Sequence, residues 1–278
     1  MSHPIIAIIG AGNMGSSLIG GLIRNGHPAD RLWATDPRSE KREELKETFA
    51  IHTTGDNAAA VQAADIVVFA VKPQIFSMVA GSLHEAVQLR KPLVLSIAAG
   101  ITLSSIQHWL GGNIAIVRAM PNTPALISCG AAALYANEEV TAEQRSKAES
   151  ILRSVGVAIW LSDEKQMDTV TALSGSGPAY FFLMMEALQQ AAQQCGLPEE
   201  TARLLTLQTA LGAARMAIES GKQLDELRHN VTSPGGTTER AVTVLEENNI
   251  RDVFLKAVQA AKQRSEELAR LMEGKGQG

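Results

Sequence analysis

Three glycines near the start of the sequence have the spacing of a turn that binds a dinucleotide. The apolar run Ile5–Ile9 leads directly into Gly10–Gly15 (GAGNMG), and the amphipathic segment Met14–Asn25 follows. Between a strand and a helix, the first glycine makes a tight turn, the second lets a pyrophosphate approach the backbone, and the third lets the helix pack on the strand. The helix start offers N–H groups and a positive dipole end to the anion. We therefore predict a dinucleotide site; a purely structural glycine turn is the competing interpretation.

An acidic residue follows at the distance that this motif requires. Asp36 comes directly after a second apolar run, Leu32–Thr35. An acid at that point usually binds the ribose 2′-OH of NAD, whereas a nearby arginine accommodates the 2′-phosphate of NADP. This sequence has both, because Arg38 stands two residues later. The phosphate state of the cofactor therefore stays open, and Arg38 is alternatively a solvated residue at the start of the next helix.

Two further segments lie at the ends of apolar runs and are expected beside the cofactor. They are Ala70–Pro73 (AVKP) and Ile97–Gly100 (IAAG). In an open α/β sheet the ligand lies outside the carboxyl ends of the strands, and small residues there let a nicotinamide ring approach the backbone. Lys72 either contacts the cofactor or points to water.

Two glycine-rich helix starts in the second half of the chain have the groups that bind a small carboxylate. Leu173–Pro178 (LSGSGP) and Asn230–Thr238 (NVTSPGGTT) each combine backbone N–H groups, hydroxyl groups and the start of a predicted helix. Helix capping alone also explains each segment, since Ser, Thr and Gly are preferred at such positions. Two such segments after a dinucleotide-binding domain favour a substrate carboxylate held between the helical part and the nicotinamide.

The helical half offers no strong acid–base pair. It contains one histidine, His229, around which neither a Ser-His-Asp triad nor a metal site can be assembled, so we expect no metal. Cys129 and Cys195 are too far apart for a CxxC motif, which argues against a disulfide framework. These absences favour the reduction of a substrate that arrives already protonated, such as an imine.

The composition is that of an ordinary globular protein. The 278 residues suggest two domains, and 45% hydrophobic with 19% charged residues allow a sizeable core. A net charge of −4 makes nucleic acid a poor partner. The first residues, MSHPIIAIIG, have no basic stretch, and their apolar run is too short for a signal or a membrane span. We therefore expect a cytoplasmic protein without a membrane partner.

The order of apolar and amphipathic segments predicts an α/β fold: a Rossmann-like doubly wound sheet followed by an all-α domain. A boundary near Asp163 gives a dinucleotide-binding domain over residues 1–163 and an all-helical substrate-binding and dimerisation domain over residues 164–278. Predicted helices include Arg38–Phe49 and Thr141–Arg153, and the tail Gly274–Gly278 is expected to be disordered. The predicted strands are Ile5–Ile9, Leu32–Thr35, Ile66–Val71, Leu93–Ile97, Ile114–Arg118, Ala131–Tyr135 and Val157–Leu161.

One helical segment is apolar nearly all round. Tyr180–Leu188 (YFFLMMEAL) has a composition that a surface helix does not tolerate, so it belongs to a domain core or to a subunit interface. A helical domain of this size would leave much apolar surface uncovered by itself. We therefore expect a homodimer.

In this order, the motifs GAGNMG, AVKP, SIAAG, RAMPNTP, LSGSGPAY and NVTSPGGTT closely resemble those of bacterial pyrroline-5-carboxylate reductases, over nearly the whole chain. The resemblance implies hydride transfer from NAD(P)H to the C=N carbon of 1-pyrroline-5-carboxylate, which gives L-proline in the last step of proline biosynthesis. It also implies interlocked dimers that assemble into larger rings such as a decamer. Asp36 departs from members that prefer NADP(H), in which a hydroxyl or Asn often stands near this position, so NAD(H) remains an alternative cofactor.

The resemblance also implies roles for individual residues. Thr238 would be the catalytic residue, because its hydroxyl would orient and polarise the ring nitrogen; the proton donor stays unassigned. Substrate binding is implied for Glu164, Ser176, Asn230, Gly236, Thr237 and Thr238. Cofactor binding is expected at Ile9, Gly10, Ala11, Gly12, Asn13, Met14, Gly15, Asp36, Arg38, Asn57, Ala70, Val71, Lys72, Pro73, Ile97, Ala98 and Ala99.

Two other functions compete with this interpretation. One is another NAD(P)-dependent imine or β-hydroxyacid oxidoreductase. The β-hydroxyacid dehydrogenase family has a pattern with a catalytic lysine on the helix after its glycine-rich turn, whereas Pro178–Cys195 contains no lysine. A non-catalytic NAD(P)-binding redox sensor is the other. It would need an output surface such as a basic recognition helix, and none is visible in the sequence.

Overall fold

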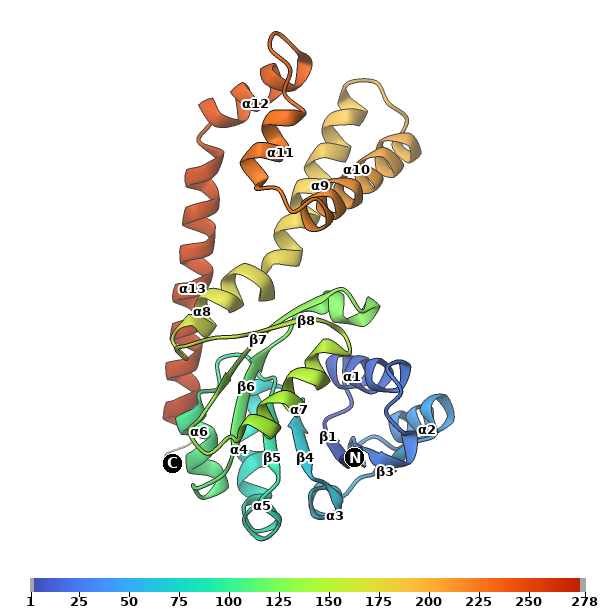
Figure 1. Cartoon of the computed structure of the whole chain (residues 1–278), viewed down its shortest axis with the longest axis vertical. Coiled ribbons are helices and arrows are strands. Elements are labelled where there is room, and N and C mark those ends of the chain that lie inside the picture. Colours follow the sequence, from blue (N-terminus) through green and yellow to red (C-terminus); the bar gives the residue numbers. More distant parts are fainter. Residues whose placement is uncertain (1–2, 276–278) are drawn as a thin grey trace. The chain divides into compact units, whose positions relative to one another are not determined.

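The computed structural model describes residues 3–275, which form two compact units. The first unit contains the chain up to Ser176 together with the residues from Ala260 on, and the second contains Gly177–Gln259 (Figure 1). The predicted boundary at Asp163 therefore does not coincide with the division into compact units, because residues 164–176 and the part of the last helix from Ala260 on belong to the first unit.

An eight-stranded sheet forms the centre of the first unit, in the order β3-β2-β1-β4-β5-β6-β7-β8. From β1 the sheet continues through β2 and β3 on one side and through β4 on the other. The strand order reverses at this switch point, where doubly wound folds bind their ligands. The strands are β1 (Ile6–Ile9), β2 (Leu32–Thr35), β3 (His52–Thr54), β4 (Ile66–Phe69), β5 (Leu93–Ser96), β6 (Ile116–Met120), β7 (Gly130–Ala136) and β8 (Gly156–Trp160).

Two features of the sheet go beyond what the sequence predicts. Strand β3 was not predicted, because it has only three residues and none is fully buried. Strand β7 runs antiparallel to β6, while every other pair is parallel. The link between them holds only the short 3-10 helix Thr123–Ile127, and a parallel connection would need a longer crossover.

Helices cover both faces of the sheet and create two separate cores. In β1, Ile6 and Ile8 belong to one hydrophobic cluster and Ala7 and Ile9 to the other, as the alternation of side chains along a strand requires. Helices α1, α2 and α7 contribute to the first cluster, and α3 to α6 contribute to the second. They are α1 (Asn13–Arg24), α2 (Ser39–Phe49), α3 (Asn57–Ala63), α4 (Pro73–Ser82), α5 (His84–Arg90), α6 (Leu103–Leu110), α7 (Ala142–Arg153) and α8 (Gln166–Val170).

The second unit is helical, as predicted, and among the described residues no strand follows β8. Its helices are α9 (Gly177–Gln194), α10 (Glu199–Glu219), α11 (Leu224–Asn230), α12 (Thr237–Glu247) and the first part of α13 (Ile250–Lys275), which continues into the first unit. Helix α13 includes two residues of the tail that was expected to be disordered; residues 276–278 of that tail lie outside the described part.

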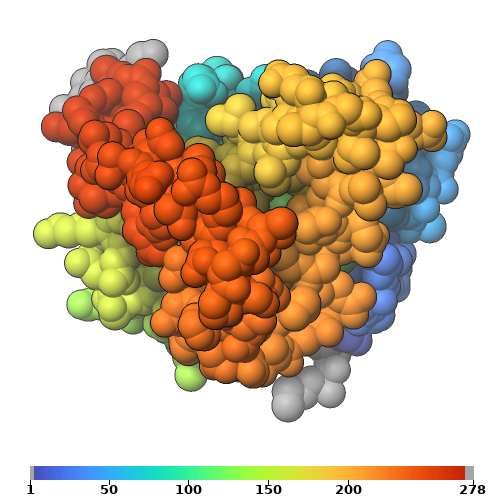
Figure 2. Space-filling model, turned by 90° about the horizontal axis from the view of Figure 1, so that it is seen from above, coloured from blue at the N-terminus to red at the C-terminus, as the bar shows by residue number. Residues whose placement is uncertain are grey.

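Helices α9 and α10 leave a large apolar surface exposed. Phe181, Phe182, Leu183 and Leu188 each expose 62–66% of their surface. A groove of about 730 Å³ lies between the two helices, where Met184, Leu205 and several alanines line it. Figure 2 looks onto these helices, coloured yellow to light orange. A large exposed apolar surface of this type marks an interaction site.

Within residues 3–275, no helix combines the length and the apolar composition needed to span a bilayer.

Candidate active site

The turn between β1 and α1 has the geometry that its glycines predict. Gly10 has a φ of +96°, and a Cβ on it would lie 2.9 Å from the Ala70 carbonyl oxygen. A Cβ on Gly15 would collide with the Gly10 carbonyl oxygen, so this glycine allows the helix to pack on the turn. A Cβ on Gly12 would meet no atom within 4 Å. The backbone at Gly12 is therefore open, as the approach of a pyrophosphate requires.

Helix α1 begins at this open position. Gly12 is its N-cap residue, in an extended conformation, and makes no side-chain cap. A helix start without a side-chain cap is suited to an anionic ligand, because the first N–H groups of a helix and its dipole favour negative charge. The residues present thus fit a dinucleotide pyrophosphate.

Asp36 and Arg38 form an ion pair after β2. The Nε of Arg38 donates to Asp36 Oδ1 at 3.0 Å and its Nη2 donates to Oδ2 at 3.2 Å. Asp36 is 7% exposed, whereas the Arg38 side chain is 64% exposed. Arg42 supports the same loop by donating from Nη1 to the Asp36 carbonyl at 2.8 Å. A buried acid with an exposed arginine bound to it thus lies where the adenosine ribose is expected.

The other predicted cofactor segments meet at the carboxyl ends of neighbouring strands. Ala70–Pro73 follows β4 and starts α4, and Ile97–Ala99 follows β5. Ala70 N–H donates to the Ile9 carbonyl at 2.9 Å, which places the first segment beside the glycine turn. Lys72 is exposed and is the N-cap residue of α4. Asn57 starts α3, after β3.

A cavity of about 310 Å³ opens next to these strand ends, within the first unit. Its wall combines the two predicted cofactor segments with α13 and with the chain just before α9. The lining residues are Pro73, Gln74, Ala99, Gly100, Thr171, Ser176, Ala261, Arg264, Ser265, Leu268 and Met272.

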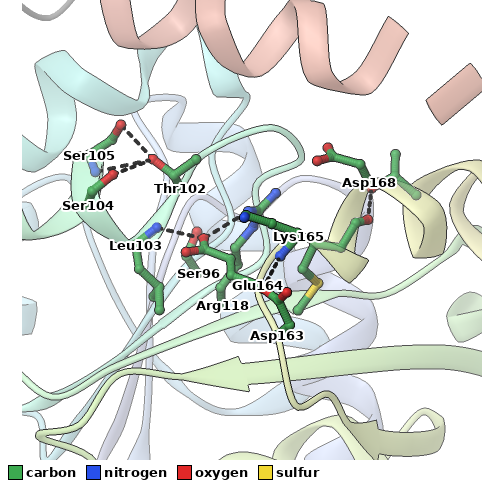
Figure 3. A network of polar contacts seen from close by, with 12 residues as sticks. Ser96, Thr102, Leu103, Ser104, Ser105, Arg118, Asp163, Glu164, Lys165 and Asp168 are labelled. Atoms are coloured by element: carbon green, nitrogen blue, oxygen red, sulfur yellow. Dashed lines mark hydrogen bonds and ion pairs between the residues drawn. The ribbon is translucent and has the colours of Figure 1, made fainter. Parts of the chain in front are cut away.

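Glu164 is held by two hydrogen bonds to its Oε1. Arg118 Nη1 donates at 2.9 Å and the Leu103 backbone N–H donates at 2.8 Å (Figure 3). The Arg118 side chain is 5% exposed and Glu164 is 25% exposed. Leu103 is the first residue of α6. The carboxylate therefore joins the middle of β6, the start of α6 and the approach to α8, and it neutralises a buried guanidinium.

Ser176 lines the cavity, but the helix start expected around it differs from the prediction. Residues Thr171–Gly175 form a π-helical turn that directly continues α8. The Ser176 N–H donates to the Thr171 carbonyl at 2.8 Å. This N–H group is therefore already bound and is not one of those that the Leu173–Pro178 segment could offer to a carboxylate.

The second glycine-rich segment has the predicted form, in the second unit. Gly235 has a φ of +72°, and its N–H donates to Glu239 Oε2 at 2.7 Å. Gly236 is the N-cap of α12 and makes no side-chain cap, and the helix starts at Thr237. Thr238 is half-buried, while Asn230 and Thr237 are exposed. The segment thus presents a helix start and a hydroxyl group.

Comparison with known proteins accounts for these features together. Residues 164–268 match a family model described as pyrroline-5-carboxylate reductase dimerisation, and residues 5–100 match one described as NADP oxidoreductase, coenzyme F420-dependent. A pyrroline-5-carboxylate reductase of Pseudomonas aeruginosa is 52% identical over 97% of this chain and 98% of the relative. The chain belongs to the pyrroline-5-carboxylate reductase family. A second relative of that name, from Vibrio alginolyticus, is 43% identical over 98% of this chain and all of its own.

Solved structures of the family have the same fold. A pyrroline-5-carboxylate reductase from Coxiella burnetii superposes with a TM-score of 0.92 at 50% identity and covers 95% of this chain and 98% of its own. The Plasmodium falciparum pyrroline carboxylate reductase, solved with NADP bound, superposes with a TM-score of 0.84 at 30% identity and covers 97% of this chain and 99% of its own.

Several residues that line the 310 Å³ cavity or contact the segment beside it were not predicted from the sequence. Arg118 and Asn122 belong to the RAMPNTP motif, which contributed to the family resemblance but received no role. Arg264 and Ser265 come from α13 and reach the cavity only because this helix returns to the first unit. No local motif marks them. Ser265 is 5% exposed and donates from Oγ to Asp168 Oδ1 at 2.7 Å, which fixes α13 to α8.

Proposed function

We propose that this chain is a pyrroline-5-carboxylate reductase that reduces the C=N bond of 1-pyrroline-5-carboxylate to L-proline, the last step of proline biosynthesis. Membership of the family over nearly the whole chain is the observation that carries the proposal. The open glycine turn beside the ends of β4 and β5 supports the redox chemistry. In the balanced reaction the imine carbon gains a hydride, the ring nitrogen keeps or gains one proton, and the reduced nicotinamide is oxidised.

NADP(H) is the proposed cofactor, with NAD(H) as the alternative. When bound, it supplies the hydride. The Gly10–Gly15 turn and the start of α1 would hold its pyrophosphate, and Asp36 with Arg38 would bind the adenosine ribose. Ala70–Pro73 and Ile97–Ala99 would border the nicotinamide half, since they follow the neighbouring strands β4 and β5.

Each residue of the proposed substrate site has its own role. The backbone around Gly236–Thr238 would bind the carboxylate through the N–H groups of Thr237 and Thr238, because the Gly236 N–H already donates to the Ser233 carbonyl at 3.0 Å. The Thr238 hydroxyl would donate to or accept from the ring nitrogen. Glu164, Ser176 and Asn230 would complete the site; for Glu164 the oxygen proposed for a ligand is Oε2, because Oε1 already accepts two hydrogen bonds. Fixing both nitrogen and carboxylate also orients the imine carbon, which is bonded to the nitrogen on the side away from the carboxylate-bearing carbon, toward the hydride.

We further propose that the helical unit forms a homodimer and that dimers assemble into a larger ring such as a decamer. The apolar faces of α9 and α10 support the first step, as does the dimerisation model that these helices match. The cytoplasm is the proposed location, in keeping with two exposed free cysteines in a reducing compartment. Light scattering after size-exclusion chromatography would give the number of subunits.

The decisive experiment mixes the purified protein with NADPH or NADH and follows nicotinamide absorbance with and without 1-pyrroline-5-carboxylate. We expect oxidation only when the imine is present, with L-proline as product. Absence of turnover with both cofactors would overturn the proposal. Turnover of a β-hydroxyacid instead would identify another dehydrogenase, and cofactor binding without any turnover would favour a redox sensor.

A further inference from the structure

We propose that Asn122 is a positioning residue for the substrate site, because it holds the π-helical turn Thr171–Gly175 against the sheet and thereby fixes Ser176. This inference rests on the proposed function, since it takes Ser176 to border the substrate. It gives a role to the RAMPNTP motif, Arg118–Pro124, which the glycine turn and the cofactor segments leave unexplained.

Three alternate residues of this motif contact the segment that carries Glu164 and Ser176. Arg118 pairs with Glu164. Met120 lies against Gly175, since a Cβ added to Gly175 would lie 2.6 Å from the Met120 Cε. Asn122 donates from Nδ2 to the Ser174 carbonyl at 2.9 Å.

The spacing of these contacts follows from strand geometry. Arg118 and Met120 lie in β6, and Asn122 continues in an extended conformation with φ −134° and ψ 170°. Alternate residues of an extended chain project to the same side. The end of β6 therefore acts as a continuous support for residues 164–176.

Asn122 connects the π-helical turn to β7. Its Oδ1 accepts the Ala131 N–H at 2.9 Å, while its Nδ2 binds the Ser174 carbonyl. A short side chain that donates and accepts at once is needed here, and only the asparagine amide combines the two at this length. Both partners are backbone groups, so the side chain fixes main chain to main chain.

The position of this turn determines one wall of the cavity. Thr171 and Ser176 stand at its two ends and both line the 310 Å³ cavity, and the Ser176 N–H closes the turn on the Thr171 carbonyl. Turns of this type are rare and occur frequently at functional sites. Release of the Ser174 carbonyl would let both wall residues shift together.

The chain provides a matched control at the opposite end of β6. Asn137 accepts the Ile116 N–H on Oδ1 at 2.9 Å and donates from Nδ2 to the Ile114 carbonyl at 2.8 Å. It is half-buried, like Asn122, and bridges backbone groups in the same way. Ile116 is the first residue of β6, so this bridge lies away from the π-helical turn.

The test compares Asn122→Ala with Asn137→Ala in the full-length protein. Hydrogen exchange of residues 164–177 should accelerate in Asn122→Ala and stay at the wild-type rate in Asn137→Ala. With saturating NADPH, kcat/KM for 1-pyrroline-5-carboxylate should fall about ten- to a hundredfold in Asn122→Ala, the cost of a misplaced site, and change less than about twofold in Asn137→Ala. NADPH affinity should stay unchanged in both.

A second pair of variants keeps the test decisive if the alanine variants fold poorly. Asn122→Asp still accepts the Ala131 N–H but cannot donate to Ser174, and Asn137→Asp matches its charge. Equal exchange and equal kcat/KM in the two members of each pair would overturn the proposal. If the wild-type protein shows no turnover, the proposed function fails, whereas the exchange comparison still decides whether Asn122 holds the turn.

Discussion

Arg38 binds both carboxylate oxygens of Asp36, and its own backbone N–H also donates to Oδ1 at 3.0 Å. Burial acts to raise the pKa of Asp36, but the hydrogen bonds and charge of Arg38 outweigh it and hold the pKa below its ordinary value. The acid is thus charged and neutralised by its neighbour. A 2′-phosphate would meet an ion pair here instead of an isolated carboxylate.

Removal of Arg38 should therefore change cofactor preference. In Arg38→Ala the Asp36 carboxylate is uncompensated and repels a 2′-phosphate, while a ribose 2′-OH can still donate to it. We expect the Kd of NADPH to rise about tenfold or more and that of NADH to change little. Fluorescence titration measures both, with Lys46→Ala on the exposed side of α2 as control. Equal weakening of the two cofactors would rule out a role in selectivity.

Gly12 and Gly15 should respond differently to the same methyl group. Gly12→Ala adds a Cβ to open space, so thermal stability should stay close to wild type while cofactor binding falls strongly, because the methyl group occupies the path of the pyrophosphate. Gly15→Ala collides with the Gly10 carbonyl and should lower the free energy of unfolding by about 1–3 kcal/mol. Calorimetry and cofactor titration separate the two. Normal cofactor affinity in Gly12→Ala would contradict the assignment.

Loss of Glu164 should destabilise the first unit. Glu164→Ala leaves the buried Arg118 guanidinium and the start of α6 without their shared acceptor. We expect a loss of about 3 kcal/mol in the free energy of unfolding, measured by urea denaturation. Glu143→Ala, which removes an exposed pair with Lys147, is the control and should change little. A stable Glu164→Ala protein with weaker substrate binding would instead assign Glu164 to the ligand alone.

The elements best predicted from the sequence are those with a local cause. β1, β4 and β5 are buried on both faces and are apolar except for Ser96 at the end of β5, so their existence follows from composition. Gly10 and Gly15 occupy positions that exclude a Cβ, so their spacing identifies the turn. Strand β3 has no such local signal, because its strand conformation depends on its pairing with β2.

The parts of the site that were missed depend on distant contacts. Arg118 meets Glu164 across 46 residues of sequence, and Ser265 meets Asp168 across 97. The π-helical turn leaves no periodic pattern, because a single i→i+5 closure fits within a helical sequence. Only the fold brings these residues together.

Stability should depend on pH through His27. Burial of the ring, followed by the nearby His3, lowers its pKa below 6.5. As pH falls through 6.5, the unfolded chain binds a proton that the folded protein does not, so the folded state loses stability until pH reaches the lowered pKa. Urea midpoints measured from pH 7 to pH 5 should decline more steeply in wild type than in His27→Asn. Parallel curves would show that His27 does not contribute.

Thr238 should act on the substrate and not on the cofactor. Its hydroxyl stands on the first turn of α12, beside the Gly236 N-cap, and the proposed partner is the ring nitrogen. In Thr238→Ala we expect kcat to fall about tenfold or more, because the nitrogen is no longer oriented or polarised, with an unchanged Kd for NADPH. Thr243→Ala, on the same helix, is the control and should keep wild-type kcat. Unchanged turnover in Thr238→Ala would remove this residue from the mechanism, and the carboxylate-binding helix start would then have to orient the substrate by itself.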